Sequence, residues 1–350
     1  MKRATSATLP LMAGMAAMCW HSISAAETID GPRVHWNFAY WGKPRAQSVL
    51  YEKFAEYVDE RTGGKFTMQI HWGTLTQPRD NLDGIKLGAY EGTHFVGSYY
   101  PGKLPAANGI GLPFLPFTTY PQLAAVYDDY FAHPQLVEEL GRWGGLYYMG
   151  AIIAQYEVIG RGTPPSGLEG WKGQRIRAPG PVGQIKRAVG AVPTSVPSPE
   201  VYTSMDRGLV DSVAFPYYAL SAYTIHEIGD WFTHGLKLAT STSGFMIRTE
   251  AYEELPDQYK AVMEEYRTSV GYPAAAAAYE ESDAASLQTF RDAGLHEVAY
   301  NAEERQAFAV ETARPVWDEW VEKVTDLGYD GAALLELLLE SGERHEEASF

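Results

Sequence analysis

Cysteine is almost absent from this chain of 350 residues: the single one is Cys19. It lies within a segment of 26 residues that has the features of a secretory signal, with a basic start, a short apolar stretch and small residues before the expected cleavage site. Cleavage would remove Cys19, so we expect no disulfide framework and export to the periplasm. A lipid anchor on Cys19 is an alternative, but Met18 stands where a small residue is needed.

Basic residues are also scarce, with 28 Lys and Arg against 44 Asp and Glu. Loss of the signal would remove two basic residues and no acidic one, which leaves 26 against 44 and a formal charge of −18. Such a surface lacks the basic stripe of a nucleic-acid-binding protein. No apolar run approaches the length of about 18 residues that spans a bilayer, so we expect no membrane insertion.

Motifs of catalysis are missing as well. The chain has no G-x-S-x-G elbow, no phosphate-binding loop, no complete dinucleotide fingerprint and no calcium loop. His226 and Glu227 would need a histidine at position 230 to form a zinc-protease motif, and Asp230 stands there. The sequence therefore predicts no enzyme, no metal and no cofactor.

Strand and helix patterns alternate through the chain. Alternating or apolar runs at 33–41, 65–72 and 93–100 predict strands, and the segments 45–61 and 81–90 between them predict helices. This order is typical of βαβ units and a parallel sheet. The sequence therefore indicates the α/β class.

Two strand-like segments are placed to carry the chain between two lobes. The stretch 146–154 leads into a Gly-Pro-rich segment, and 240–249 would bring the chain back. A helical stretch over about 256–293 is long enough to pack along both lobes, with a kink expected at Pro273. We expect lobe I over 27–154 plus about 243–282, and lobe II over 155–242 plus about 283–350.

The segment 170–213 is the most informative part of the chain. A short strand over 174–178 ends at Pro179-Gly180 and places Arg177 at its exit, ahead of a helix, a second short strand and PEVYTSMDRGLVDSV. A guanidinium can hold a carboxylate by two parallel hydrogen bonds. Arg177 is therefore a candidate ligand anchor.

Aromatic residues gather near the expected strand ends, where ligands bind in open α/β sheets. Large rings can equally close an interface between lobes. Together they predict a cleft with flat walls that excludes water. These residues are Tyr40, Trp41, Tyr99, Tyr100, Tyr156, Phe215, Tyr217, Tyr218 and Trp231.

Five segments in order resemble the solute-binding subunit of tripartite ATP-independent periplasmic (TRAP) transporters, of the dicarboxylate-binding-protein-like family. They are FAEYVDERTGGKFTMQIHWGTL (54–75), GIKLGAYEGTHFVGSYYPGKLPA (84–106), GLPFLPF (111–117), GWKGQRIRAPG with PEVYTSMDRGLVDS (170–212), and EELPDQYKAV (253–262). The resemblance implies a periplasmic receptor with two α/β lobes that close on a small carboxylate held by Arg177. It also implies a small and a large membrane subunit as partners.

Two positions depart from the family. A second arginine is often found about twenty residues before Arg177, where this chain has Glu157, with Arg161 nearby as a substitute. An asparagine is often found where this chain has Phe215. Both changes argue against a strongly anionic solute such as a dicarboxylate.

The sequence argument places a zwitterion first, with its cationic group against the rings and Glu157 as counter-charge. An aromatic or branched monocarboxylate is the competing solute, and Glu157 could instead pair with Arg161 or Arg177. A secreted enzyme or a sensor-associated domain on the same scaffold is the alternative function. The expected site residues are Arg177, Phe215, Tyr40, Trp41, Tyr99, Tyr156, Glu157, Tyr218, Ser98 and Gln77.

Overall fold

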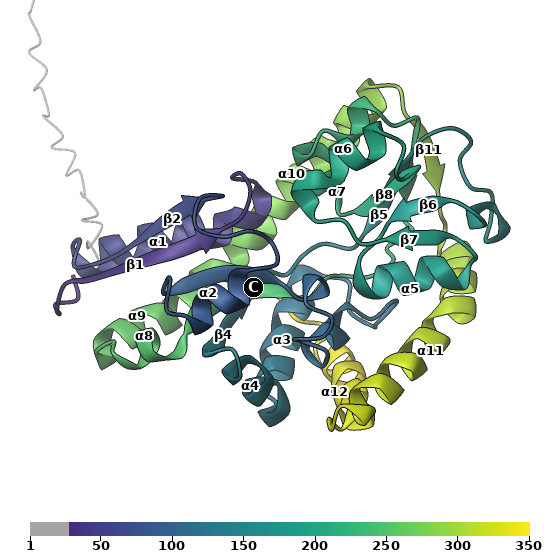
Figure 1. The fold of residues 1–350 in the computed structure, drawn as a ribbon. Helices are drawn as coiled ribbons and strands as arrows, with labels where there is room; N and C mark the ends of the chain where they lie inside the picture. The colour runs from purple at the N-terminus through teal and green to yellow at the C-terminus, as the bar shows by residue number, and fades with distance from the viewer. Residues whose placement is uncertain (1–27) are drawn as a thin grey trace, which may run out of the picture.

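Two separate β-sheets organise the protein, each in its own half of the molecule (Figure 1). The computed structural model describes residues 28–350, so the expected signal sequence and Cys19 lie outside the described residues. The first sheet has the order β2-β1-β3-β10-β4 and the second the order β11-β9-β5-β8-β6-β7. Both halves contain strands and helices, which confirms the α/β class.

The first sheet contains the strands that the sequence predicts near the N-terminus. β1 runs parallel to β2 and β3, whereas β10 runs antiparallel to β3 and β4. The sheet is therefore mixed, because β10 arrives from the second sheet and runs against its neighbours. The strands are β1 (Val34–Tyr40), β2 (Phe66–Trp72), β3 (Gly92–Val96), β4 (Gly145–Gly150) and β10 (Ser243–Arg248).

The second sheet carries the strand of Arg177. β6 lies parallel to both β7 and β8, while β5 is antiparallel to β8 and β9. The strands are β5 (Glu157–Gly160), β6 (Arg175–Arg177), β7 (Val192–Thr194), β8 (Ser212–Phe215), β9 (Trp231–His234) and β11 (His296–Ala299).

Two extended segments, 151–156 and 235–242, connect the sheets and run side by side. The amide of Tyr156 donates to the carbonyl of Ala239 (2.9 Å), and the amide of Leu238 donates to the carbonyl of Tyr156 (3.1 Å). They overlap the crossing segments that the sequence predicts. A pair of crossing strands is the geometry from which two lobes can hinge.

A long helical stretch forms the third connection. It consists of α9 (Asp257–Tyr266), a π-helical turn (Arg267–Gly271) and α10 (Tyr272–Asp292). The turn ends two residues before Pro273, which has no backbone N–H to continue the helical ladder. α10 packs on α1 of the first half and on α7 of the second.

The C-terminal helices return to the first half. α11 (Ala302–Asp326) packs on α5, and α12 (Gly331–Arg344) packs on α3 beneath the first sheet (Figure 1). The Gln122 side-chain amide donates to the carbonyl of Gly342 (2.7 Å). The sequence-based limits assign all of 283–350 to lobe II, whereas α12 lies against lobe I; the limits as a whole stay a prediction.

The remaining helices cover the faces and ends of the two sheets. None of the helices within residues 28–350 combines the length and apolar character that crossing a bilayer requires. These remaining helices are α1 (Val49–Thr62), α2 (Asn81–Lys86), α3 (Tyr120–Phe131), α4 (Pro134–Gly141), α5 (Gly180–Ala188), α6 (Val201–Asp206), α7 (Tyr217–Ala222) and α8 (Thr249–Glu253).

Candidate functional site

Arg177 stands at the carboxyl end of β6 and is completely buried. Its Nε donates to the carbonyl of Val196 (2.9 Å), and one terminal nitrogen donates to the carbonyl of Ala214 (3.1 Å). The other terminal nitrogen donates to the Tyr99 hydroxyl (3.3 Å). A guanidinium has five N–H groups, so these three bonds do not use all of its donors.

No carboxylate neutralises this cation. Arg177 forms no ion pair with any described residue, and its guanidinium carbon lies 4.0 Å from the centroid of the Phe215 ring. Burying a charge without an opposite partner is costly. An anionic ligand would supply the missing partner.

A narrow cavity lies beside Arg177, between the two halves of the protein. Phe215 and Tyr99 form part of its wall, so the guanidinium lies directly behind them. In this closed conformation its volume is about 20 Å³, room for about one water molecule, so the lobes must part before a solute can enter. The lining residues are Trp41, Arg45, Gln47, Val96, Tyr99, Ile153, Tyr156, Ser198, Phe215, Pro216, Tyr218, Ala219 and Tyr223.

The charges around this cavity have one sign. Arg45 is its only ionised side chain at neutral pH, and Arg177 lies behind the wall; neither Asp nor Glu is among the lining residues. Two polar atoms near the cavity are buried without a hydrogen-bond partner among the described residues, the indole nitrogen of Trp41 and the hydroxyl of Tyr223. The cavity therefore offers donors and aromatic faces, and suits an anion with an apolar body.

Tyr99 joins the two lobes in this closed conformation. It belongs to the short 3-10 helix Gly97–Tyr99 that follows β3, and its hydroxyl lies 2.7 Å from Ser198 Oγ of the other lobe. Gly180, at φ 56°, comes so close to this turn that an added Cβ would lie 2.9 Å from the Cβ of Ser98. The absence of a side chain at Gly180 thus allows α5 to approach the first lobe.

Arg45 and Gln47 are site residues that the sequence reasoning missed. Both follow β1, and Gln47 Oε1 accepts hydrogen bonds from Arg45 Nε (3.2 Å) and Nη2 (2.8 Å). The Arg45 guanidinium carbon lies 5.0 Å from the Trp41 ring and 5.8 Å from the ring of Tyr223 in the other lobe. Their position beyond the end of β1 is the sequence signal that marks them, since ligands bind beyond the carboxyl ends of strands in open α/β sheets.

Five of the ten expected site residues line the cavity, and Arg177 touches its wall. Tyr40 does not line it, because it is buried behind Arg45 and Trp41. Ser98 lines two neighbouring cavities, a small one with Tyr156 and one of about 350 Å³ between α5 and α11. Gln77 is exposed on the loop after β2 and is not a lining residue. The five that line the cavity are Trp41, Tyr99, Tyr156, Phe215 and Tyr218.

Glu157 faces away from the cavity, contrary to the expected role as a counter-charge. Successive side chains of a strand point to opposite faces, so Tyr156 reaches the cavity and Glu157 does not. Its carboxylate accepts from the Thr233 hydroxyl (2.7 Å) and from the amides of Gly235 (3.1 Å) and Lys237 (3.0 Å). Burial raises the pKa of Glu157 to about 7.

The two alternative ion pairs of Glu157 are also not formed. Neither Arg161 nor Arg177 pairs with it. Arg161 instead donates to the carbonyls of Ile228 (2.8 Å) and Met205 (2.9 Å), outside the cavity. It therefore does not replace the second arginine of the family pattern.

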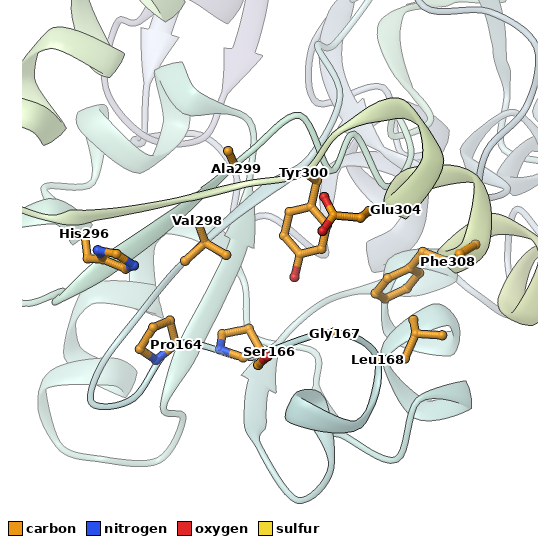
Figure 2. A pocket seen from close by; sticks show the side chains of 12 residues that line it. Pro164, Ser166, Gly167, Leu168, His296, Val298, Ala299, Tyr300, Glu304 and Phe308 are labelled. Atoms are coloured by element: carbon orange, nitrogen blue, oxygen red, sulfur yellow. The ribbon is translucent and has the colours of Figure 1, made fainter.

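A larger cavity of about 400 Å³ lies elsewhere in the second half, between the 164–168 loop, β11 and α11 (Figure 2). Its ionisable lining residues include His296 and Glu304 but no lysine or arginine. It is thus a poor site for an anion. Within residues 28–350, no group of three His, Cys, Asp or Glu side chains is placed to hold a metal ion.

Comparisons with known proteins agree with this architecture. The family described as bacterial extracellular solute-binding protein, family 7 (DctP) matches residues 40–323. A TRAP solute-binding protein from Rhodoferax ferrireducens, solved with copurified benzoate, has a TM-score of 0.82 at 19% identity and covers 90% of this chain and 99% of that one.

Two curated relatives match a smaller share of this chain. The monocarboxylate 2-oxoacid-binding periplasmic protein of Nostoc is 26% identical over 66% of this chain, and the match spans 64% of that relative. The ectoine-binding periplasmic protein TeaA of Halomonas elongata is 22% identical over 81% of this chain and 83% of its own length. The resemblance and the two-lobed fold expected from the sequence are confirmed, and the chain belongs to family 7 of the bacterial extracellular solute-binding proteins.

Proposed function

We propose that this protein is the periplasmic receptor of a TRAP transporter and that it captures an aromatic monocarboxylate by closing its lobes. The observation that carries this proposal is the Arg177 guanidinium, buried without a carboxylate partner beside a cavity with aromatic walls and no acidic lining residue. The carboxylate of the solute would become the partner of Arg177.

Solute binding would exchange one contact of Arg177 for another. Its bond to the Tyr99 hydroxyl is the longest of its three, at 3.3 Å against 2.9 and 3.1 Å for the carbonyls. Displacement of that hydroxyl would let two N–H groups meet the carboxylate in parallel. Closure then excludes water and strengthens these charge-assisted bonds.

The aromatic residues in the wall of the cavity favour a solute that contains an aromatic ring. Phe215 and Tyr223 stack with centroids 5.7 Å apart, and Tyr156 and Trp41 contribute further ring faces. Contacts between aromatic rings contribute about 0.5–1.5 kcal/mol each beyond the area they bury. A planar ring would pack between these faces once the lobes part to admit it, because the cavity of the closed conformation holds only about 20 Å³.

A zwitterion, which the sequence argument placed first, fits these residues less well. Its cationic end would need either a carboxylate or a group of aromatic rings with no other cation beside them. Glu157 cannot be that carboxylate, because it faces away from the cavity and accepts a hydrogen bond from Thr233. Arg45 already occupies the faces of Tyr40 and Trp41 with a positive charge. Ectoine, the ligand in the name of the Halomonas relative, is therefore a weaker candidate here than benzoate, the ligand of the Rhodoferax protein.

The membrane partners follow from the family. A solute receptor of this kind would deliver its ligand to the small and large TRAP subunits and would not transform it. Recovery of the bound compound unchanged, by mass spectrometry after incubation, would support a receptor; conversion of the compound would support the enzyme alternative.

The test is a thermal-shift and calorimetric screen of the secreted protein, stripped of copurified ligand by unfolding and refolding. The panel contains benzoate, hydroxybenzoates, mandelate, a branched 2-oxoacid, succinate, glycine betaine and ectoine. A ligand at a hundredfold excess over its Kd stabilises the native state by about 2.7 kcal/mol. We expect such shifts with the aromatic acids. Binding of betaine or ectoine alone, or of succinate alone, would overturn the assignment of the solute.

A further inference from the structure

A second arginine reaches the candidate site from the opposite lobe. Arg45 lines the cavity from the loop after β1, whereas Arg177 approaches it from the end of β6. Arg45 forms no ion pair with any described carboxylate. Its hydrogen bonds go to Gln47 Oε1 and to the carbonyl of Lys43 (3.0 Å). As with Arg177, N–H groups remain for a ligand.

Arg45 is held rather than free to turn away. Gln47 accepts from two of its nitrogens and also from the Tyr40 hydroxyl (3.2 Å), so one amide oxygen connects the arginine to the core of the first lobe. The guanidinium carbon lies 4.9 Å from the Tyr40 ring and 5.0 Å from the Trp41 ring. A fixed guanidinium loses little entropy when it binds a ligand.

Two further donors lie around the same guanidinium. The indole N–H of Trp41 and the hydroxyl of Tyr223 are both buried without a partner among the described residues. A Cβ placed on Gly42 would lie 3.1 Å from Arg45 Nη1 and 3.6 Å from the Tyr223 oxygen, so these two groups border one small region. Unpaired buried polar groups carry a free-energy cost that a ligand oxygen can remove.

We infer that Arg45 is a specificity-determining residue that recognises a second oxygen acceptor on the ligand ring, away from the carboxylate held by Arg177. This inference rests on the proposed function and names its substrate class: an aromatic acid that carries a hydroxyl or a second carboxylate. Arg45 and Trp41 supply donors only, and the Tyr223 hydroxyl can donate, so the group they select is an acceptor.

Arg45 makes a second anionic group on the solute acceptable, although Glu157 occupies the position where the family often has a second arginine. Arg45 comes from a different strand end and serves the same purpose. Its neighbour Tyr223, in the other lobe, stacks on Phe215, and Phe215 lies against Arg177, so ring contacts connect the two cationic groups across the cavity.

Arg45→Met is the decisive variant, because it keeps the length of the side chain and removes the donors. Calorimetric Kd values would be measured for benzoate, for 3- and 4-hydroxybenzoate and for isophthalate and terephthalate, with wild type and variant. In the wild type we expect at least one substituted acid to bind about 10–100-fold more tightly than benzoate, a preference that Arg45→Met removes. The hydroxy and dicarboxylate arms distinguish a neutral acceptor from an anionic one.

A structural role of Arg45 predicts a different pattern. If Arg45 only joins the lobes through Tyr223, its loss weakens benzoate and the substituted acids by the same factor, and that result would overturn the inference while leaving the proposed function intact. Arg79→Met is the matched control, since Arg79 also contacts the other lobe, at the carbonyl of Ser195 (3.3 Å), without lining the cavity. We expect it to leave the preference unchanged.

Gln47→Leu tests the same inference without removing the arginine. It deletes the oxygen that orients the guanidinium, so we expect the preference for substituted acids over benzoate to fall, by a smaller factor than in Arg45→Met. Failure of every aromatic acid to bind the wild type would refute the proposed function itself, and this inference with it.

Discussion

Replacement of Arg177 by methionine is expected to abolish solute binding while the fold persists. With the Tyr99 hydroxyl displaced, two N–H groups of Arg177 would form charge-assisted hydrogen bonds with the carboxylate, each contributing about 1.5–3 kcal/mol. Their combined loss of about 3–6 kcal/mol corresponds to a Kd that rises roughly 100- to 10,000-fold. Arg177→Lys keeps the charge but not the planar fork, so its Kd should lie between those of the wild type and the methionine variant.

The binding experiment requires that the Arg177→Met variant stays folded, and two opposing effects determine its free energy of unfolding. Arg177→Met leaves the carbonyls of Val196 and Ala214 without their donor, at a cost of about 1–3 kcal/mol each. It also removes a completely buried cation that has no carboxylate partner, which stabilises the ligand-free state. The net change should be small enough for the variant to unfold cooperatively.

The assay is isothermal titration of the tightest aromatic acid, together with thermal unfolding of the ligand-free proteins. Arg175→Gln is the control on the same strand: Arg175 is exposed, pairs with Asp211 and should change neither affinity nor stability by more than about 1 kcal/mol. An Arg177→Met protein that binds the acid within threefold of the wild type would refute the assignment of Arg177 as anchor.

Three further predictions concern buried groups and lobe closure. Because burial raises the pKa of Glu157 from 4.5 to about 7, the native state holds more protons than the unfolded state in that window, and stability falls as pH rises from about 4.5 to 7, by roughly 3 kcal/mol in total. Glu157→Gln should remove this decline in denaturant titrations; an unchanged slope would contradict it. Lys186 is buried with its Nζ 3.1 Å from the Trp171 ring centroid and no hydrogen-bond partner among the described residues, and burial lowers its pKa. Lys186→Met should therefore raise the unfolding free energy at neutral pH by about 1–4 kcal/mol, a gain that shrinks toward pH 10.5 as the lysine deprotonates in the unfolded state too; a loss of stability would refute this. Tyr99→Phe removes the hydroxyl that meets Ser198 across the lobes, so small-angle scattering of the ligand-free variant should report a larger radius of gyration than the wild type, and an identical radius would show that this contact does not hold the lobes together.

The architecture was predictable because it depends on long patterns. Segments 33–41 and 65–72 alternate or run apolar, and they form β1 and β2 within a residue or two of the expected limits. The helix expected over 45–61 forms α1 and ends at Gly63, whose φ of 58° suits a glycine. Local backbone chemistry determines such elements, so no knowledge of distant contacts is needed.

The path of the C-terminus was not predictable in the same way. α12 has a clear helical pattern, but nothing in residues 331–344 indicates that it leaves the second lobe and packs on α3. The contact between Ser341 and Asp129 joins residues that are far apart in the chain. Which helix α12 packs against depends on surfaces of distant segments that come together only when the chain folds.

The residues of the candidate site also fall into those that the sequence predicts and those that only the tertiary structure identifies. The sequence by itself determined Arg177 at a strand exit and a set of rings near strand ends, because residue type and strand boundaries are local properties. The tertiary structure alone decided which side chains meet: Glu157 turns away since it follows Tyr156 by one residue in a pleated strand, and Arg45 enters since Gln47 holds it toward the other lobe. A shift of one residue along a strand moves a side chain to the opposite face of the sheet. Contact between the two lobes brings together loops that are far apart in the sequence. For these two reasons the positive charge of the cavity could be identified only in the folded protein.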